Sequence, residues 1–193
     1  MEVLWLGEDE VKDLLTMDEA IAAVREAFYD HGIGRTQMPP KSYLNFAPYE
    51  GDLRSMPAYL ERVDQAGVKT VNVHTRNAAI GLPTVMALLT LVSPKTGAPL
   101  AIMGATHLTA MRTGAAGAVA ARLLAREESR AVGMIGAGVQ ARAQLLGLSR
   151  LFELDQVRIF DLSLESCQSL AKYGRDIFNG EFMVCFSSFV LTI

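Results

Sequence analysis

The chain has 193 residues and half of them are hydrophobic, which is enough to bury the core of one large or two small domains. Its 18 basic and 21 acidic residues are mixed along the sequence and leave a net charge of −3, so we expect no nucleic-acid partner and no binding to an anionic membrane. No apolar run reaches the roughly 18 residues of a membrane span, and Glu2 stands where a secretory leader needs positive charge. These features favour a cytoplasmic protein with a small-molecule partner.

The cysteines and histidines argue against a metal centre and against a disulfide scaffold. Cys167 and Cys185 form no C-x-x-C motif. His31, His74 and His107 lack the short spacings of zinc ligands. We therefore expect no metal and a reducing compartment.

Residues 1–107 predict a first domain of the α+β type. A capping box, Thr16-Met-Asp-Glu19, opens a helix, and Gly32 is well placed to end it. From 38 to 77 the sequence changes to short extended pieces broken by prolines and a glycine. This composition indicates strands and turns of an antiparallel layer.

The same layer continues with a hairpin. Residues 84–92 and 98–103 are apolar runs of strand length, and the segment 93–97, Ser-Pro-Lys-Thr-Gly, is a turn sequence. The two runs are therefore predicted to pair as antiparallel neighbours.

One strand of this layer carries a cation on its apolar side. In the strand 68–74, the period-two alternation places Lys69 on the same side as Val71 and Val73. An ammonium group there is costly unless it is paired, so such a lysine is kept to hold an anion or to move a proton. The alternative is a lysine that marks the edge of the sheet.

The segment 108–128 is predicted to bridge two domains, with a helix over 108–126. A stripe of small residues lets this helix approach another backbone closely; the stripe consists of Ala110, Gly114, Gly117, Ala118 and Ala121. Arg112 and Thr113 lie in the first turns, where a guanidinium and the helix N-terminus together can clamp a carboxylate or a pyrophosphate. The alternative is an exposed arginine in a surface salt bridge.

The strongest signal lies in residues 132–141, Val-Gly-Met-Ile-Gly-Ala-Gly-Val-Gln-Ala. An apolar strand can end at Ile135, Gly136 can make a tight turn, and Gly138 can bring the main chain against a pyrophosphate at the start of a helix. The sequence therefore predicts part of a dinucleotide-binding Rossmann domain over 129–193. The alternative is a glycine turn in an ordinary α/β domain.

A carboxylate follows at the distance that a Rossmann unit requires. Residues 156–161 predict a second strand that ends in Asp161, 25 residues after Gly136. An acid in this place accepts hydrogen bonds from the adenosine ribose and repels a 2′-phosphate. The next residues, Leu-Ser-Leu, offer no arginine to that phosphate, so the sequence predicts NAD rather than NADP as the cofactor.

Four segments, in this order, closely resemble the ornithine cyclodeaminase and μ-crystallin family: 66–72, 81–84, 108–116 and 135–141. The similarity runs from Leu4 to about residue 175. The family's fold is a substrate-binding and dimerisation domain followed by a Rossmann domain. The resemblance therefore implies an α/β protein with that architecture, and a homodimer.

The resemblance also implies roles for particular residues. Lys69 and Arg112 match positions that contact the carboxylate of an amino acid, and Lys41 matches another carboxylate-binding position, which is usually arginine. Positions that hold the dinucleotide correspond to Thr84, Arg112, Val139, Gln140 and Asp161, to which the local patterns add Thr113, Gly136 and Gly138.

One position departs from the family's cyclodeaminases, which place a glutamate two residues before a Met-Pro pair to receive the distal ammonium of ornithine. Arg54 stands there in this chain and should repel ornithine, so we assign it to the substrate site. The resemblance then favours hydride transfer between NAD and a small, alanine-like amino acid or its imine or 2-oxo acid, with Lys69 as the catalytic residue. The alternative enzyme is an ornithine cyclodeaminase, which forms proline and ammonia.

Family members are markedly longer, and their later residues complete the Rossmann sheet and supply a catalytic aspartate. Residues 181–193 do not resemble the family, which predicts a truncated or frameshifted end, with a third strand as the milder alternative. Such a chain leaves a sheet edge and an apolar face uncovered. The third hypothesis is therefore a remnant that binds nucleotide or dimerises without catalysis.

Overall fold

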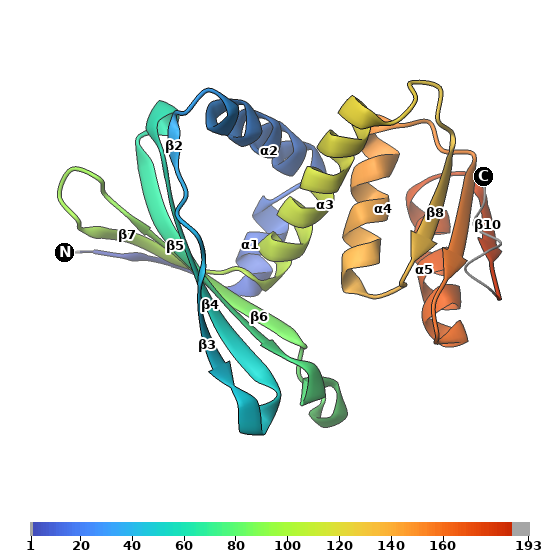
Figure 1. Cartoon of the computed structure of the whole chain (residues 1–193), viewed down its shortest axis with the longest axis horizontal. Helices are drawn as coiled ribbons and strands as arrows, with labels where there is room; N and C mark the ends of the chain where they lie inside the picture. Colours follow the sequence, from blue (N-terminus) through green and yellow to red (C-terminus); the bar gives the residue numbers. More distant parts are fainter. Residues whose placement is uncertain (1, 187–193) are drawn as a thin grey trace. The chain divides into compact units, whose positions relative to one another are not determined.

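The computed structural model describes residues 2–186 and divides the chain into two compact units. The first unit combines Met1–Leu15 with Glu26–Thr109, and the second combines Thr16–Arg25 with Ala110–Ile193. Both units contain helices and strands, so the protein is of the α/β class that the sequence predicts (Figure 1).

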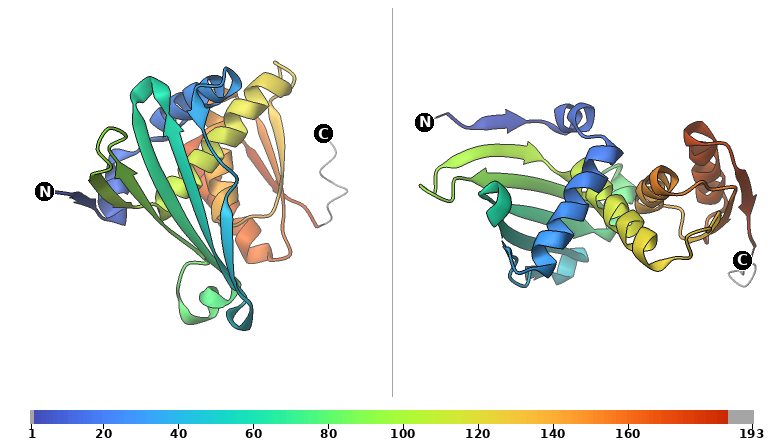
Figure 2. Two further views of the ribbon diagram at one scale, coloured as in Figure 1. Left: turned by 60° about the vertical axis from the view of Figure 1, so that its left-hand side comes forward. Right: turned by 90° about the horizontal axis from the view of Figure 1, so that it is seen from above.

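The first unit is built on a seven-stranded sheet, in which the long strands β4 and β5 run side by side (Figure 2). The strands follow the order β1-β7-β6-β5-β4-β2, and β3 also pairs with β4. The pair β1 and β7 is parallel, whereas the other pairs are antiparallel. The strand bounds are Leu4–Leu6 (β1), Thr36–Gln37 (β2), Ser42–Phe46 (β3), Gly51–Leu60 (β4), Gln65–His74 (β5), Val85–Val92 (β6) and Pro99–Gly104 (β7).

Tight turns keep strands that follow each other in the chain next to each other in the sheet. The amide of Gly97 donates to the carbonyl of Ser93 over 2.8 Å, and Gly97 has a φ of 73°, which side chains rarely tolerate. The predicted antiparallel layer and the hairpin at 93–97 are thus confirmed. Short 3-10 helices make three other connections: η1 (Ala47–Tyr49), η2 (Glu61–Val63) and η3 (Thr75–Ile80).

The two faces of this sheet differ in what they carry. Val71 and Ala87 lie opposite each other in register and are buried in an apolar cluster, and we call their side of the sheet the inner face. The opposite, outer face carries large apolar side chains in contact with solvent. Leu88 is 48%, Leu44 61% and Trp5 62% exposed.

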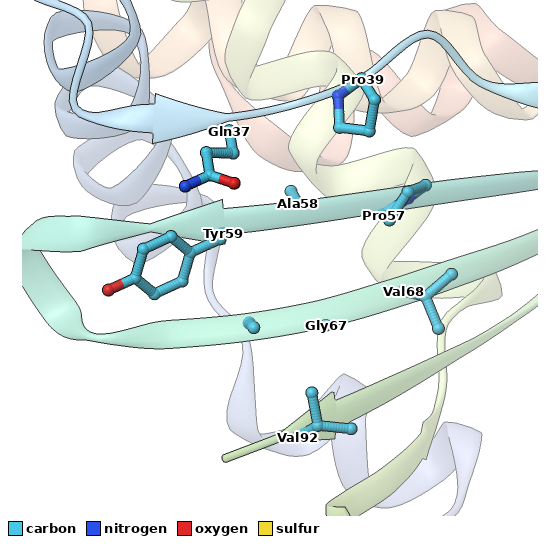
Figure 3. Close-up of a pocket in the computed structure, with 9 residues that line it drawn as sticks. Gln37, Pro39, Pro57, Ala58, Tyr59, Gly67, Val68 and Val92 are labelled. Carbon is cyan, nitrogen blue, oxygen red and sulfur yellow. The ribbon is translucent and has the colours of Figure 1, made fainter. Parts of the chain in front are cut away.

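A hollow of about 390 Å³ lies on the outer face. Its floor comes from three adjacent strands, through Pro57 and Tyr59 of β4, Val68 of β5 and Val92 of β6 (Figure 3). Gln37 and Pro39, from β2 and the segment after it, complete the lining. The outer face is therefore both apolar and indented.

Two helices lie between β1 and β2 in the chain, α1 (Glu8–Leu14) and α2 (Met17–Gly32). The predicted capping box opens α2: the amide of Thr16 donates to the Glu19 carboxylate over 2.9 Å, and the amide of Glu19 donates to Thr16 Oγ1 over 3.3 Å. The helix ends at Gly32, as the sequence predicts.

The second unit holds a parallel sheet in the order β10-β9-β8. One face of it packs on α4 and α5, and the fully buried side chains include Leu145, Val157, Ile159 and Leu170. This arrangement is the start of a Rossmann sheet. The bounds are Thr106–Leu124 (α3), Ala131–Ile135 (β8), Val139–Leu151 (α4), Gln156–Phe160 (β9), Leu164–Ile177 (α5) and Glu181–Val184 (β10).

Within the second unit, α3 and α4 touch through their backbones. A β-carbon on Gly114 would lie 2.2 Å from the carbonyl oxygen of Ala143, and one on Gly147 would lie 2.7 Å from the carbonyl oxygen of Gly114. The amide of the Gln144 side chain also donates to the carbonyl of Thr113 over 3.1 Å. The small residues of α3 therefore do bring two backbones together.

We predict that Gly114→Ala lowers the unfolding temperature, because the new methyl group forces α3 and α4 apart. Overpacking of this kind costs about 2–3 kcal/mol, or roughly 5–10 °C in a chain of this size. Gly32→Ala is the control, because a β-carbon there meets no atom within 4 Å. A calorimetric scan in which both variants unfold at the same temperature as the unaltered chain would contradict the close contact between α3 and α4.

Candidate functional site

The loop between β8 and α4 presents main chain rather than side chains. Gly136 has a φ of 94°, and no atom lies within 4 Å of a β-carbon built on Gly136 or on Gly138. Gly138 is the N-cap of α4, and no side chain caps the helix there. Val139 and Gln140, which begin α4, are exposed. The loop can therefore admit an anion to the positive end of α4.

Asp161 lies directly after β9 and reaches this loop. Its Oδ2 accepts a hydrogen bond from the amide of Ala137 over 2.7 Å, and its Oδ1 accepts one from the amide of Ser163 over 2.8 Å. The amides of Ser163 and Ala137 lower the pKa of the carboxyl, so it is ionised at neutral pH. The contact arises because parallel strands end at the same edge of a sheet.

The N-terminus of α3, in contrast, is closed to a ligand. Glu8 of α1 accepts hydrogen bonds from the amides of Thr106 over 2.6 Å and His107 over 3.1 Å. Burial raises the pKa of Glu8, but these two amides lower it more, so that it lies below its ordinary value. The prediction that this helix terminus helps Arg112 to clamp a ligand is wrong, because the helix begins at Thr106 and a carboxylate of the chain already fills its end.

Arg112 itself lies in the second turn of α3. Burial lowers the pKa of its guanidinium although the residue as a whole is exposed, so protein atoms screen the charged end from water. Within residues 2–186 no carboxylate forms an ion pair with it. Thr113, the next residue, is partly buried. A screened cation without a carboxylate is suited to bind an anion.

The inner face of the first unit brings three predicted substrate residues to one side of the sheet. Lys69 is buried, pairs in register with Met56 and is two residues from Val71, as the alternation predicts. Arg54 lies opposite Val71 and therefore shares this face. Lys41 precedes β3 and is two residues from Tyr43, which lies opposite Arg54 in the register. The alternation of an extended chain therefore places Lys41 on the same face as Tyr43 and Arg54.

Side chains around Arg54 form a compact charged group. Arg54 donates from Nε to Oδ1 of Asp52 over 2.7 Å and from Nη2 to Oδ2 over 2.8 Å. Its guanidinium lies 5.5 Å from the centre of the Tyr43 ring, and the ammonium of Lys41 lies 5.6 Å from the same centre. These two hydrogen bonds lower the pKa of the Asp52 carboxyl and raise the pKa of the Arg54 guanidinium.

Sequence reasoning missed two members of this group, Asp52 and Tyr43. The spacing of Asp52 and Arg54 in one strand was the available signal, because residues two apart share a face. Thr84 stands apart from the group: it is exposed, just before β6, and its carbonyl accepts from the amide of His74 over 2.8 Å.

The predicted residues thus fall into two sets. The first unit holds Lys41, Arg54, Lys69 and Thr84; the second holds Arg112, Thr113, Gly136, Gly138, Val139, Gln140 and Asp161. Between residues 2 and 186, no group of three or more metal-ligating side chains lies close enough to hold an ion. No helix in the described part of the chain has the length and hydrophobicity needed to cross a bilayer.

Comparison with known families shows to which family the chain belongs. The ornithine cyclodeaminase/mu-crystallin family model matches residues 2–189. The chain belongs to this family. The match includes most of the segment 181–193, so the prediction that residues after 180 leave the family pattern is wrong for 181–189. Residues 181–184 form the third strand of the sheet, whereas 187–193 lie outside the described residues.

Individual family members are similar over most of the chain. The alanine dehydrogenase of Archaeoglobus fulgidus is 49% identical over 176 residues, which are 91% of this chain and 53% of that enzyme. The structure of an archaeal alanine dehydrogenase dimer with bound NAD has 48% identity and a TM-score of 0.90, covering 96% of this chain and 56% of that one.

A second structure is that of the Δ1-pyrroline-2-carboxylate reductase of Thermococcus litoralis with NADH and L-proline. It is 35% identical with a TM-score of 0.94, over 98% of this chain and 59% of that one. The chain spans about half the length of the curated family members it matches.

The Glu8 cap predicts a pH-dependent stability. We expect Glu8→Gln to lower the unfolding free energy at pH 7 by about 1–2 kcal/mol, because the ionised carboxylate holds the first turn of α3. Since the pKa of Glu8 is lowered on folding, this stabilisation is complete above its ordinary value of 4.5 and is lost as the pH falls through the folded-state value. The difference between variant and unaltered chain should thus shrink below about pH 4.5 in thermal scans.

Glu61→Gln is the control for this experiment. The Glu61 side chain is exposed and has no hydrogen-bond or ion-pair partner among the described residues, so its loss should change stability little at any pH. A Glu8→Gln effect that is the same at pH 3 and pH 7 would contradict the capping role.

Proposed function

We propose that the chain is the cofactor-binding and substrate-binding part of an NAD-dependent oxidoreductase that acts on a small amino acid or its imine or 2-oxo acid. The observation that carries the proposal is the ionised Asp161 carboxylate beside a glycine loop that leads into α4. The alanine dehydrogenase of Archaeoglobus fulgidus, at 49% identity, supports the substrate class. NAD in the archaeal alanine dehydrogenase dimer supports the cofactor.

The residues of the second unit fit a dinucleotide. Space beside Gly136 and Gly138 leaves room for a pyrophosphate against the main chain, and Val139 and Gln140 would flank it. Asp161 would accept hydrogen bonds from the ribose hydroxyls and repel a 2′-phosphate, which favours NAD over NADP. Thr84, Arg112 and Thr113 complete the proposed cofactor set.

The inner face of the first unit fits a carboxylate. Lys41, Arg54 and Lys69 place three cations on one side of the sheet, and Arg112 is the fourth proposed carboxylate ligand. The cations of the sheet would fix the substrate by its carboxylate and orient its α-carbon. NAD supplies the hydride acceptor or, when reduced, the hydride donor. Lys69 would relay a proton to or from the substrate nitrogen, or polarise an imine.

Ornithine cyclisation is the second candidate. In that reaction the imine is attacked by the side-chain amine, ammonia leaves and proline forms. Arg54, in place of the glutamate of the family's cyclodeaminases, disfavours it because a cation faces the incoming ammonium. The remaining hypothesis is a chain that binds nucleotide or dimerises without turnover.

We also propose that two chains associate through the outer face of the first unit, in the cytoplasm. Exposed Leu88, Leu44 and Trp5 make this face costly to leave in water. The dimer named for the archaeal alanine dehydrogenase supports a two-chain assembly.

The activity predicts net NADH from L-alanine. When the protein is incubated with NAD and L-alanine, the NADH absorbance should rise. When it is incubated with NAD and L-ornithine, no proline should form. Lys69→Ala should lower kcat by about 100-fold, because a proton relay contributes about that much. Lys172→Ala, on the exposed side of α5, is the control.

Three outcomes separate the hypotheses. NADH from alanine supports the proposal, proline without net NADH supports cyclisation, and uptake of NAD without either product supports a non-enzymatic remnant. The last two contradict the proposal.

The proposed dimer predicts that a charged residue on the outer face lowers the mass of the particle in solution. Leu88→Glu should convert a particle of two chains into one of a single chain in sedimentation analysis, because a carboxylate cannot be buried unpaired. Leu123→Glu alters a side chain of the second unit that is 77% exposed and should leave the dimer intact. A Leu88→Glu chain that sediments as a dimer would exclude the outer face as the interface.

A further inference from the structure

Asp52 and Arg54 meet in a defined geometry on the inner face. Both residues belong to β4, two positions apart, so their side chains leave the sheet on the same side. Asp52 accepts from Nε and from Nη2, which form the side edge of the guanidinium. The Asp52 side chain is only 20% exposed and that of Arg54 only 31%, which limits the alternative orientations of the pair.

This arrangement leaves one edge of Arg54 available. A guanidinium has five N–H donors in one plane, and Asp52 engages two of them. The donors of Nη1 and the second donor of Nη2 lie on the end edge, and Nη1 has no hydrogen-bond partner among the described residues. A carboxylate can accept two parallel hydrogen bonds from such an edge.

Tyr43 and Lys41 lie beside Arg54 on the inner face. The Tyr43 ring lies opposite Arg54 in the register of β3 and β4, and the cations of Arg54 and Lys41 both lie within 6 Å of the ring centre. The Asp52 carboxylate offsets part of the repulsion between these two cations. Lys41, Arg54 and Asp52 together therefore carry a net positive charge, while the Arg54 guanidinium is paired with Asp52.

Asp52 is also the only acidic residue of the four strands β3 to β6. Because Arg54 engages both of its oxygens, the inner face offers no uncompensated carboxylate from these strands to an ammonium group. A distal ammonium of a substrate bound at this face would meet no free carboxylate from these four strands, and an unpaired charge is costly in a half-buried site.

We propose that Asp52 positions Arg54 as a receptor for a substrate carboxylate and, by the same pairing, excludes amino acids with a distal ammonium. The inference rests on the proposed function and narrows its substrate class to amino or 2-oxo acids with a short side chain that carries no cation. Asp52 acts through Arg54 and is a positioning residue, not a catalytic one.

The test is a set of NMR titrations of the full chain with pyruvate and with L-ornithine in the presence of NAD, following the backbone amides of β4 and β5. Asp52→Asn should weaken pyruvate binding by about tenfold, the equivalent of one charge-assisted contact. Arg54→Gln should weaken pyruvate similarly and strengthen ornithine by about tenfold, because it releases the Asp52 carboxylate. The double variant should lose the gain for ornithine.

Matched controls come from a surface pair of the same chemistry. Arg76 and Glu50 pair at exposed positions of the same unit, so Arg76→Gln and Glu50→Gln should leave both ligands unaffected. If Asp52→Asn does not fold, Arg54→Lys replaces it, since lysine keeps the charge but cannot pair through two parallel hydrogen bonds.

The outcomes are distinct. Pyruvate binding that is unchanged in Asp52→Asn, or an ornithine gain that persists in the double variant, overturns the role of Asp52 alone. An unaltered chain that binds no pyruvate overturns the proposed function and this inference with it. A selective ornithine gain that requires Asp52 is an effect that loss of stability does not produce, and it supports the proposal.

Discussion

The hydrogen bond between the Asp161 carboxylate and the amide of Ala137 is the interaction on which the proposed cofactor site of the second unit depends. It joins the end of β9 to the loop after β8, and it is possible because the two strands are parallel and end at one edge. The same carboxylate accepts from Ser163, and its pKa is lowered by both amides, so a full negative charge is held beside the glycine loop. A loop built in this way offers main-chain donors to a phosphate next to an acceptor for sugar hydroxyls.

A different constraint shapes the first unit, where the sheet must hold cations on a face that also contributes to a core. Lys69 is buried two residues from Val71, and Arg54 lies opposite Val71 in the register. Charges are expensive in such surroundings unless they are compensated, and Asp52 compensates one of them. Apolar residues at these positions would give a more stable core, which is consistent with the carboxylate-binding role that we propose for this face.

Local patterns were sufficient to predict much of the fold. The capping box at Thr16, the turn that ends at Gly97 and the glycine loop at Gly136 depend on residues close together in sequence, and all three are found. The face of Lys69 followed from alternation alone. The Glu8 cap on α3 was not predicted because it joins residues almost 100 positions apart, and nothing local in 106–112 reveals that a distant carboxylate closes the helix. The pairing of Asp52 with Arg54 was missed because spacing shows that two side chains share a face, not that they meet.

Calorimetric titration of the full chain with NAD and with NADP tests the central claim most directly, because it needs neither turnover nor an identified substrate. We expect saturable binding of NAD with one site per chain, and binding of NADP that is weaker by about tenfold or more, since Asp161 would repel a 2′-phosphate. Folded chain that takes up no NAD at millimolar concentration, or that binds NADP as tightly as NAD, would contradict it.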